Sequence, residues 1–202
     1  MGRSVVLLFA VLAQVLWRTD AHAQVDADFL REHSETIRAG DAALILEKAG
    51  PTTHVEAAIV VAADPISIWE ILVACEIAPE YVPNVVSCQS VEVLDDGAAE
   101  LFIQTVKPAF FIPAFEHVFR MEYAPYERIA ISRVSGPIRQ LNSSWHLQSR
   151  DDGTVLLSYS LDVDPGIPIP RFFVRQTLRR DLPRVLKAVQ ARAEVAAAPV
   201  TQ

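Results

Sequence analysis

The feature of this sequence that most constrains its fold is a long stretch, residues 85–163, in which no helical periodicity occurs. Short apolar runs alternate there with turn signals such as Asp96-Gly97 and Asp152-Gly153. Strand-length runs separated by short turns are typical of an antiparallel meander, so we expect a sheet across this part of the chain. The runs are residues 85–94, 98–107, 108–113, 114–123, 128–134, 138–148 and 154–163.

Two of these runs also indicate which of their faces is buried. In residues 114–123 the odd positions are mainly apolar, whereas the even positions include Glu116, Arg120 and Glu122. In residues 154–164 the odd positions are again apolar, and the even positions include serine and aspartate. Because successive side chains of a strand point to opposite faces, each run should have one face toward a core and one toward water.

A strand and a helix are expected before the meander. Residues 55–63 form a continuous stretch rich in β-branched residues and alanine, which predicts a strand. The stretch ends at Asp64 and Pro65, where aspartate can cap a helix and proline can occupy its first position. Apolar residues then recur at helical spacing as far as Val73, which predicts a helix there.

A long amphipathic helix is expected after the meander. Apolar residues within 171–194 form a stripe at helical spacing, and the opposite face carries arginine and lysine. Pro183 should kink or split this helix near Arg179, because proline lacks a backbone donor and its ring clashes with the preceding turn. We expect residues 196–202 to form a frayed tail.

Together these elements predict an α+β fold. The apolar face of the sheet must be buried, and the C-terminal helix is the element available to cover it. The 202 residues correspond to one ordinary domain, and neither an internal repeat nor an interdomain linker occurs. A polar, mainly helical lead, residues 24–50, is expected to precede the domain.

The first 23 residues have the composition of a signal peptide. Arg3 supplies a short positive region, residues 5–16 are mostly apolar, and Ala21-His22-Ala23 has the small-x-small pattern of a cleavage site. We therefore expect a mature chain that begins at Gln24 and is exported, either to the periplasm or as a secreted protein. An uncleaved N-terminal membrane anchor is the alternative, although the apolar run is short for a membrane span.

The charge of the chain indicates which classes of partner it can bind. A formal net charge of -7 argues against nucleic acid as a partner, because neutralising phosphates requires a basic surface. Residues 171–194 nevertheless carry seven basic and two acidic side chains. A basic amphipathic helix can contact anionic membrane lipids. The alternative is a solvated helix face that pairs with the acidic part of the sheet.

The two cysteines leave two interpretations open. Cys75 is expected at a helix end and Cys88 on the following strand, and export would place both in a compartment that permits disulfides. They are either bridged or two unreactive buried thiols. Without a nearby pair of histidines they form no zinc site, and we expect no bound metal.

Several segments resemble a known superfamily. Asp64-Pro65-Ile66-Ser67-Ile68-Trp69-Glu70-Ile71-Leu72 and Pro79-Glu80-Tyr81-Val82-Pro83-Asn84-Val85-Val86-Ser87 resemble the opening of START-like (SRPBCC) proteins of the polyketide cyclase/dehydrase and coenzyme Q-binding type. Gly136-Pro137-Ile138, Trp145-His146-Leu147 and Gly153-Thr154 are similar to their later segments. The resemblance covers roughly residues 53–194, and on it we assign a START-like domain to residues 51–195.

The resemblance implies a helix-grip fold. In this fold a curved antiparallel sheet wraps a long C-terminal helix and leaves an apolar tunnel between them. The chain departs from the pattern at Cys75, which stands where an acidic residue often follows the first helix.

Two polar residues within the expected sheet are candidates for contact with a ligand. His117 lies between Phe115 and Phe119 on the inward face, where it could act as a general base or donate a hydrogen bond. The alternative is a core histidine bonded to a backbone carbonyl. Arg133 shares its parity with two isoleucines, and a buried arginine needs an acidic partner or an anionic ligand group. Alternatively, Arg133 lies at the end of its strand and its side chain reaches solvent.

Aromatic residues complete the expected cavity. Trp145 and Tyr159 combine an apolar body with one polar group, which suits a cavity wall, and Phe172 and Phe173 begin the helix that should cover the sheet. The side chains that we expect to bind the ligand are Phe115, His117, Phe119, Arg133, Trp145, Tyr159, Phe172 and Phe173.

The function that we favour is an exported protein that binds a hydrophobic or lipid-like small molecule between the sheet and the C-terminal helix. A cyclase or dehydratase that uses His117 and Tyr159 for proton transfer on a bound ring is the alternative. A filled core with a role in protein interaction is a third. No phosphate-binding loop, nucleophile elbow or metal-binding motif occurs, so the sequence gives no separate support for an enzyme, and we expect no cofactor.

Overall fold

The structure, a computed structural model, describes residues 25–166 and 170–198. It has eight strands in one antiparallel sheet, in the order β1-β2-β8-β7-β6-β5-β4-β3. The strands are β1 (Ala43–Ala49), β2 (Thr52–Val61), β3 (Val85–Leu94), β4 (Ala99–Val106), β5 (Phe115–Ala124), β6 (Arg128–Ser135), β7 (Gln140–Ser149) and β8 (Val155–Asp164). The helices are α1 (Ala27–Glu32), α2 (Ser34–Arg38), α3 (Pro65–Val73), α4 (Ala78–Tyr81) and α5 (Arg171–Ala197), with 3₁₀ turns η1 (Cys75–Ile77) and η2 (Asp95–Gly97).

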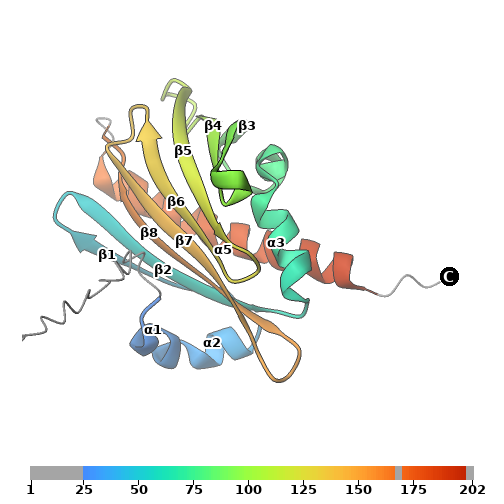
Figure 1. Cartoon of the computed structure of the whole chain (residues 1–202). Helices are drawn as coiled ribbons and strands as arrows, with labels where there is room; N and C mark the ends of the chain where they lie inside the picture. The colour runs from blue at the N-terminus through green and yellow to red at the C-terminus, as the bar shows by residue number, and fades with distance from the viewer. Residues whose placement is uncertain (1–24, 167–169, 199–202) are drawn as a thin grey trace, which may run out of the picture.

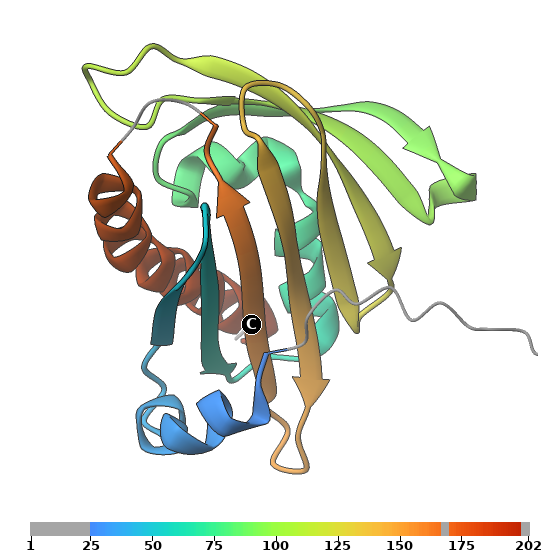
Figure 2. The same ribbon diagram turned by 90° about the vertical axis from the view of Figure 1, so that its left-hand side faces the viewer.

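The expected meander is present from β3 to β8, and the α+β helix-grip fold is confirmed. The strands curve around α5, and α3 lies against the same face (Figures 1 and 2). Residues 108–113 do not form a strand but lie in the connection between β4 and β5. Pro108 and Pro113 bound this segment, and proline has no N–H group to donate to a neighbouring strand.

The junction between β2 and α3 follows the expected capping chemistry. The Asp64 carboxylate accepts hydrogen bonds from the backbone N–H of Ser67 at 2.9 Å and from its hydroxyl at 2.8 Å. These bonds lower the pKa of Asp64. Pro65 occupies the first turn, where its missing N–H has no intrahelical partner to lose. Ile68 and Leu72 of the capped helix α3 are buried in the core.

Helix α5 continues through Pro183, so of the kink or split that we expected near Arg179, the split is wrong. A proline inside a helix costs roughly 3 kcal/mol. Burial of a large apolar side chain contributes about 1.5–3 kcal/mol, so an apolar stripe of four buried residues outweighs this cost. The helix also extends through Ala197, beyond the expected start of the frayed tail, while residues 199–202 lie outside the described residues. The stripe consists of Leu182, Val185, Leu186 and Val189.

The lead, residues 24–50, contributes directly to the sheet. Its β1 pairs with β2 from Ala43 opposite Ala58 to Ala49 opposite Thr52. Helices α1 and α2 cover the sheet face opposite α5 (Figure 2), where Phe29 and Ile37 form a second, smaller core with Ala58. Most side chains of β2 are therefore buried, whichever face of the sheet they lie on, which explains why the sequence from Ala57 to Val61 is apolar instead of alternating.

The predicted signal peptide, residues 1–23, lies outside the described residues. Among residues 25–166 and 170–198, no helix combines the length and the apolar character needed to cross a membrane.

Candidate functional site

A cavity of about 400 Å³ lies between the concave face of the sheet and helices α4 and α5. Most of its wall is apolar, with side chains such as Val82, Ile131, Leu161 and Val185. Pockets for small organic molecules usually have volumes of roughly 300–1,000 Å³ and mostly apolar walls. The cavity therefore has the size and the lining of a small-molecule site.

Four of the predicted ligand-binding residues line this cavity, namely His117, Phe119, Trp145 and Tyr159. Strand alternation brings them together, because all four lie on inward positions of β5, β7 and β8. Trp145 and Tyr159 are direct cross-strand partners, and their ring centroids are 4.3 Å apart. Phe119 stacks on Phe102 of β4 with a centroid distance of 5.6 Å.

Three of the predicted aromatic residues do not line the cavity. Phe115 is half-buried, and its ring centroid lies 6.4 Å from that of His117. Phe172 is 68 % exposed. The Phe173 ring packs against Phe111 of the β4–β5 connection at 5.7 Å. The first turn of α5 thus lies beside this connection instead of over the centre of the sheet, a placement that helical periodicity alone does not specify.

Arg133 also lies outside the cavity lining, and its side chain is exposed. It is paired with Phe119 across the β5–β6 ladder, so its position on β6 agrees with the inward parity seen in the sequence. The long side chain nevertheless turns to the β6–β7 connection, where Nη2 donates to the Gly136 carbonyl at 2.9 Å and Nε donates to the Ile138 carbonyl. These carbonyls take the place of the anionic ligand group that the sequence suggested.

His117 is only 4 % exposed. Part of this burial comes from Gly136, whose φ is +110° and whose Cα carries no side chain. A Cβ there would lie 2.7 Å from the Cβ of His117, so only glycine permits the close approach. Nε2 of His117 lies 3.0 Å from Oε1 of Gln104, and Nδ1 is buried without a hydrogen-bond partner among the residues that the structure describes.

The two predicted catalytic candidates have pKa values shifted away from neutrality. Burial lowers the pKa of His117 to about 4, and its hydrogen-bond partner is an amide instead of an orienting carboxylate. Burial raises the pKa of Tyr159, and a hydrogen bond with Ser143 opposes this increase. At neutral pH the cavity therefore presents a neutral imidazole and a neutral phenol.

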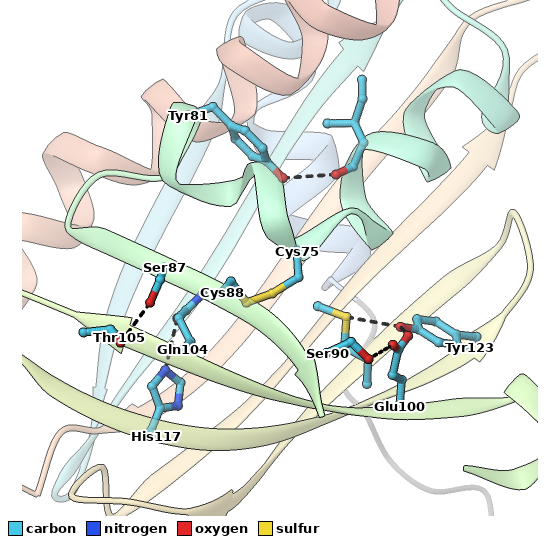
Figure 3. The surroundings of a disulfide bond; sticks show 12 residues. Cys75, Tyr81, Ser87, Cys88, Ser90, Glu100, Gln104, Thr105, His117 and Tyr123 are labelled. Carbon is cyan, nitrogen blue, oxygen red and sulfur yellow. Dashed lines mark hydrogen bonds between the residues drawn. A yellow bond between two sulfur atoms is a disulfide. The ribbon is translucent and has the colours of Figure 1, made fainter. Parts of the chain in front are cut away.

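A disulfide joins Cys75 of η1 to Cys88 of β3 (Figure 3). Their Cα atoms are 5.4 Å apart, within the usual range for a disulfide. The sequence left open either a bridge or two buried thiols, and the structure contains the bridge. It ties the helical segment over the cavity to an edge strand of the sheet, and Cys75 contributes to the cavity wall.

Tyr81 of α4 forms another part of this wall. Its hydroxyl donates to the Ile71 carbonyl at 3.2 Å, and the Arg192 guanidinium lies 5.3 Å from the ring centroid. Burial raises the pKa of Tyr81 to about 12, with a smaller opposing effect of Arg192. Tyr81 thus connects α4 with α3 and α5.

The residues predicted from the sequence do not include five polar residues of the wall, namely Asn84, Gln104, Ser143, Thr177 and Asp181. Asp181 is buried on α5 and accepts hydrogen bonds from Asn84 at 3.1 Å and from the neighbouring Arg180. The signal for Gln104 was its inward parity on β4, between Phe102 and Val106. Among the described residues, no group of three or more His, Cys, Asp or Glu side chains could hold a metal ion.

Solved structures share this fold at low sequence identity. The Zhui aromatase/cyclase from Streptomyces sp. R1128 is 19 % identical with a TM-score of 0.63, and the match covers 74 % of this chain and 98 % of that one. A STAR-related lipid transfer protein fragment from Xanthomonas axonopodis is 15 % identical with a TM-score of 0.66, covering 75 % and 93 %. The human StarD13 lipid transfer and protein localization domain is 14 % identical with a TM-score of 0.57, covering 88 % and 100 %.

The sequence comparisons agree with the fold. No curated protein matches the sequence. The family model for polyketide cyclase / dehydrase and lipid transport proteins matches residues 61–190, which is more than half of the chain. This match confirms the START-like resemblance seen in the sequence. The chain belongs to the polyketide cyclase / dehydrase and lipid transport family.

Proposed function

We propose that this protein is a carrier that holds one hydrophobic or lipid-like small molecule in the cavity between the sheet and α5. The observation that carries the proposal is the cavity of about 400 Å³ with its mostly apolar wall. Removal of apolar surface from water contributes about 25 cal/mol per Å² before the costs of association are subtracted. Affinity in such a site comes mainly from apolar burial, which suits a hydrophobic ligand.

The pKa values of the cavity residues favour the carrier over an enzyme. A general acid or base works best with a pKa near the operating pH. The pKa of His117 is instead lowered to about 4 and that of Tyr159 is raised, so neither side chain is adapted to exchange protons at neutral pH. The cyclase or dehydratase alternative would need His117 to act as a base despite its lowered pKa.

Identification of the molecules that co-purify with the protein tests the proposal. We expect mass spectrometry of protein isolated from its native compartment to find a hydrophobic molecule at a stoichiometry near one. A His117→Ala protein should still bind this molecule, although more weakly than the wild type. The enzyme is instead the correct interpretation if the wild type converts a cyclic substrate and the His117→Ala variant binds this substrate normally without converting it.

We further propose that the end of the cavity near the β4–β5 connection contacts an anionic membrane. The support is a group of exposed aromatic side chains, the rim aromatics, which consists of Phe110, Phe111 and Phe172. They are 92 %, 60 % and 68 % exposed, and Pro108 of the same connection lines the cavity. Exposed apolar patches of this kind are typical of interaction sites, and exposed basic residues of α5 such as Arg179 suit an anionic surface.

Vesicle flotation tests the membrane contact. The wild type should float with vesicles that contain phosphatidylglycerol and much less with phosphatidylcholine alone. Replacing Phe110, Phe111 and Phe172 together by serine should abolish flotation without lowering the melting temperature, because these side chains are exposed. Unchanged flotation of the triple variant would contradict the proposed contact.

We also propose that the protein is exported and acts in the periplasm or outside the cell. The support is the signal-peptide pattern of residues 1–23, together with the Cys75–Cys88 disulfide, since disulfides persist in oxidising compartments. Intact-mass measurement of the secreted form should give a chain that begins at Gln24. Recovery of the uncleaved chain in a membrane fraction would contradict cleavage.

A further inference from the structure

One row of the sheet places three side chains next to each other on the cavity side. Gln104 of β4 is paired with Cys88 of β3 on one side and with His117 of β5 on the other. Figure 3 shows Gln104 and His117 joined by the contact between Oε1 and Nε2, close to the disulfide. Both Gln104 and His117 line the cavity. Gln104 is thus a polar side chain in an otherwise mainly apolar part of the wall.

The buried environment of His117 specifies where its proton lies. Nδ1 is buried and has no hydrogen-bond partner within residues 25–166 and 170–198, whereas Nε2 lies 3.0 Å from Oε1 of Gln104. A proton on Nδ1 would create a buried N–H group without an acceptor, which is rarer in proteins than an acceptor without a donor. The neutral ring therefore carries its proton on Nε2 and donates it to Oε1 of Gln104.

This hydrogen bond specifies the orientation of the Gln104 amide. Oε1 is the acceptor for His117, so the NH₂ group forms the other end of the amide. Among the described residues, no group accepts a hydrogen bond from Nε2 of Gln104. Because Gln104 lines the cavity, the NH₂ group is a donor available to a bound molecule.

We propose that the cavity selects apolar molecules that carry a carbonyl oxygen, and that Nε2 of Gln104 donates a hydrogen bond to this oxygen. His117 is a positioning residue, since it holds the amide in the orientation that presents the donor. This inference rests on the proposed carrier function and adds the chemical class of the ligand. A molecule of the same shape whose only polar group is a donor gains nothing from Gln104.

Three planar ligands of nearly equal shape test this selection: fluorene, which has no polar group, 9-fluorenone, which adds a carbonyl oxygen, and carbazole, which adds only an N–H donor. Their affinities are measured by displacement of the apolar fluorescent probe N-phenyl-1-naphthylamine. Gln104→Leu should weaken binding of 9-fluorenone by about fivefold, the typical effect of one hydrogen bond, and change that of fluorene and carbazole by less than about twofold.

The His117→Phe variant tests the positioning role. Without the hydrogen bond from His117, the Gln104 amide can present either end to the cavity. We therefore expect 9-fluorenone to bind more weakly and carbazole to bind more tightly, while fluorene binds as before. A general loss of structure would instead weaken all three ligands together, which would contradict a specific positioning role.

The other outcomes are also decisive. If Gln104→Leu weakens carbazole alone, the amide oxygen faces the ligand and the proposed orientation is wrong. If it changes all three affinities equally, the selection is wrong while the carrier function stands. If the wild type binds neither the probe nor any of the three ligands, the carrier function itself fails.

A measurement on the wild type alone provides a second test that does not depend on any variant folding. The ¹⁵N chemical shifts of the His117 ring should identify Nε2 as the protonated nitrogen and Nδ1 as the unprotonated one. The reverse assignment would overturn the orientation of the Gln104 amide and the inference with it.

Discussion

Two groups of aromatic side chains in this protein have opposite environments. The interior aromatics, Phe102, Phe119, Trp145 and Tyr159, lie on the concave face of the sheet, three of them in the cavity wall. The rim aromatics, Phe110, Phe111 and Phe172, lie in the β4–β5 connection and at the beginning of α5, and all three are exposed.

The difference between the two groups comes from the backbone that carries them. The interior residues lie on strands with a neighbour on each side, so alternation directs their side chains to one face. The rim residues lie between Pro108 and Pro113 or in the first turn of α5, where no sheet covers them. An apolar residue on a strand is therefore a good predictor of burial in the core, whereas an apolar residue in a connection is a poor one.

The same substitution in the two groups should have very different effects on stability. Phe119→Ala should lower the free energy of unfolding by about 3–5 kcal/mol, because it leaves a cavity beside Phe102. Phe110→Ala should change it by less than about 0.5 kcal/mol, since the side chain is exposed. Urea unfolding of both variants measures the two values. Similar losses would show that the rim is packed in solution.

The disulfide joins η1, which lies over the cavity, to β3, and we expect it to stabilise the folded protein. Replacing Cys75 and Cys88 by serine should lower the free energy of unfolding by about 3 kcal/mol, the value for a loop of this length. Denaturant unfolding with and without reductant measures the effect, and the double variant should not respond to reductant. An unchanged midpoint for the reduced wild type would rule out a stabilising bridge.

The pH dependence of stability should report on the buried histidine. The folded pKa of His117 is about 4 and its ordinary value is 6.5, so the unfolded chain takes up a proton at a higher pH than the folded protein. The contribution of His117 to the free energy of unfolding is therefore present above the ordinary pKa of histidine, and it is lost as the pH falls toward the folded pKa of about 4. The loss attributable to His117 should reach about 2 kcal/mol between about pH 7 and about pH 5.

A His117→Gln variant isolates this contribution from that of the carboxylates. Urea unfolding of the wild type and the variant at both pH values gives, for each protein, the change in the free energy of unfolding with pH. This change should be larger for the wild type. Equal differences would mean that His117 does not resist protonation in the folded protein.

The sheet and the helix that covers it could be predicted because their signals are local. Alternation in residues 114–123 and 154–164, and the Asp64-Pro65 cap, each depend on a few neighbouring residues. Strand β1 was missed because its apolar run, from Ala42 to Leu46, is short and β1 forms only when paired with β2. Continuity of α5 through Pro183 likewise depends on tertiary burial.

The site could be predicted only in part, for a similar reason. Parity assigned His117, Phe119 and Tyr159 correctly to the cavity side, and the aromatic body with one polar group suggested Trp145, whereas Phe115 has the same parity as His117 but does not line the cavity. Parity does not describe where a long side chain ends, and Arg133 reaches the carbonyls of the β6–β7 connection instead. The orientation of the Gln104 amide depends on a partner from another strand, which no pattern within β4 reveals.

Titration of the apolar probe N-phenyl-1-naphthylamine into two tryptophan variants tests the central claim, a ligand site inside the cavity, most directly. Leu178 lines the cavity, whereas Gln176 is exposed on the same helix. We expect saturable binding to the wild type and to Gln176→Trp, and loss of binding to Leu178→Trp, which fills the cavity, with the fold retained by circular dichroism. Equal binding to Leu178→Trp and Gln176→Trp would contradict the claim, because the probe would then bind outside the cavity.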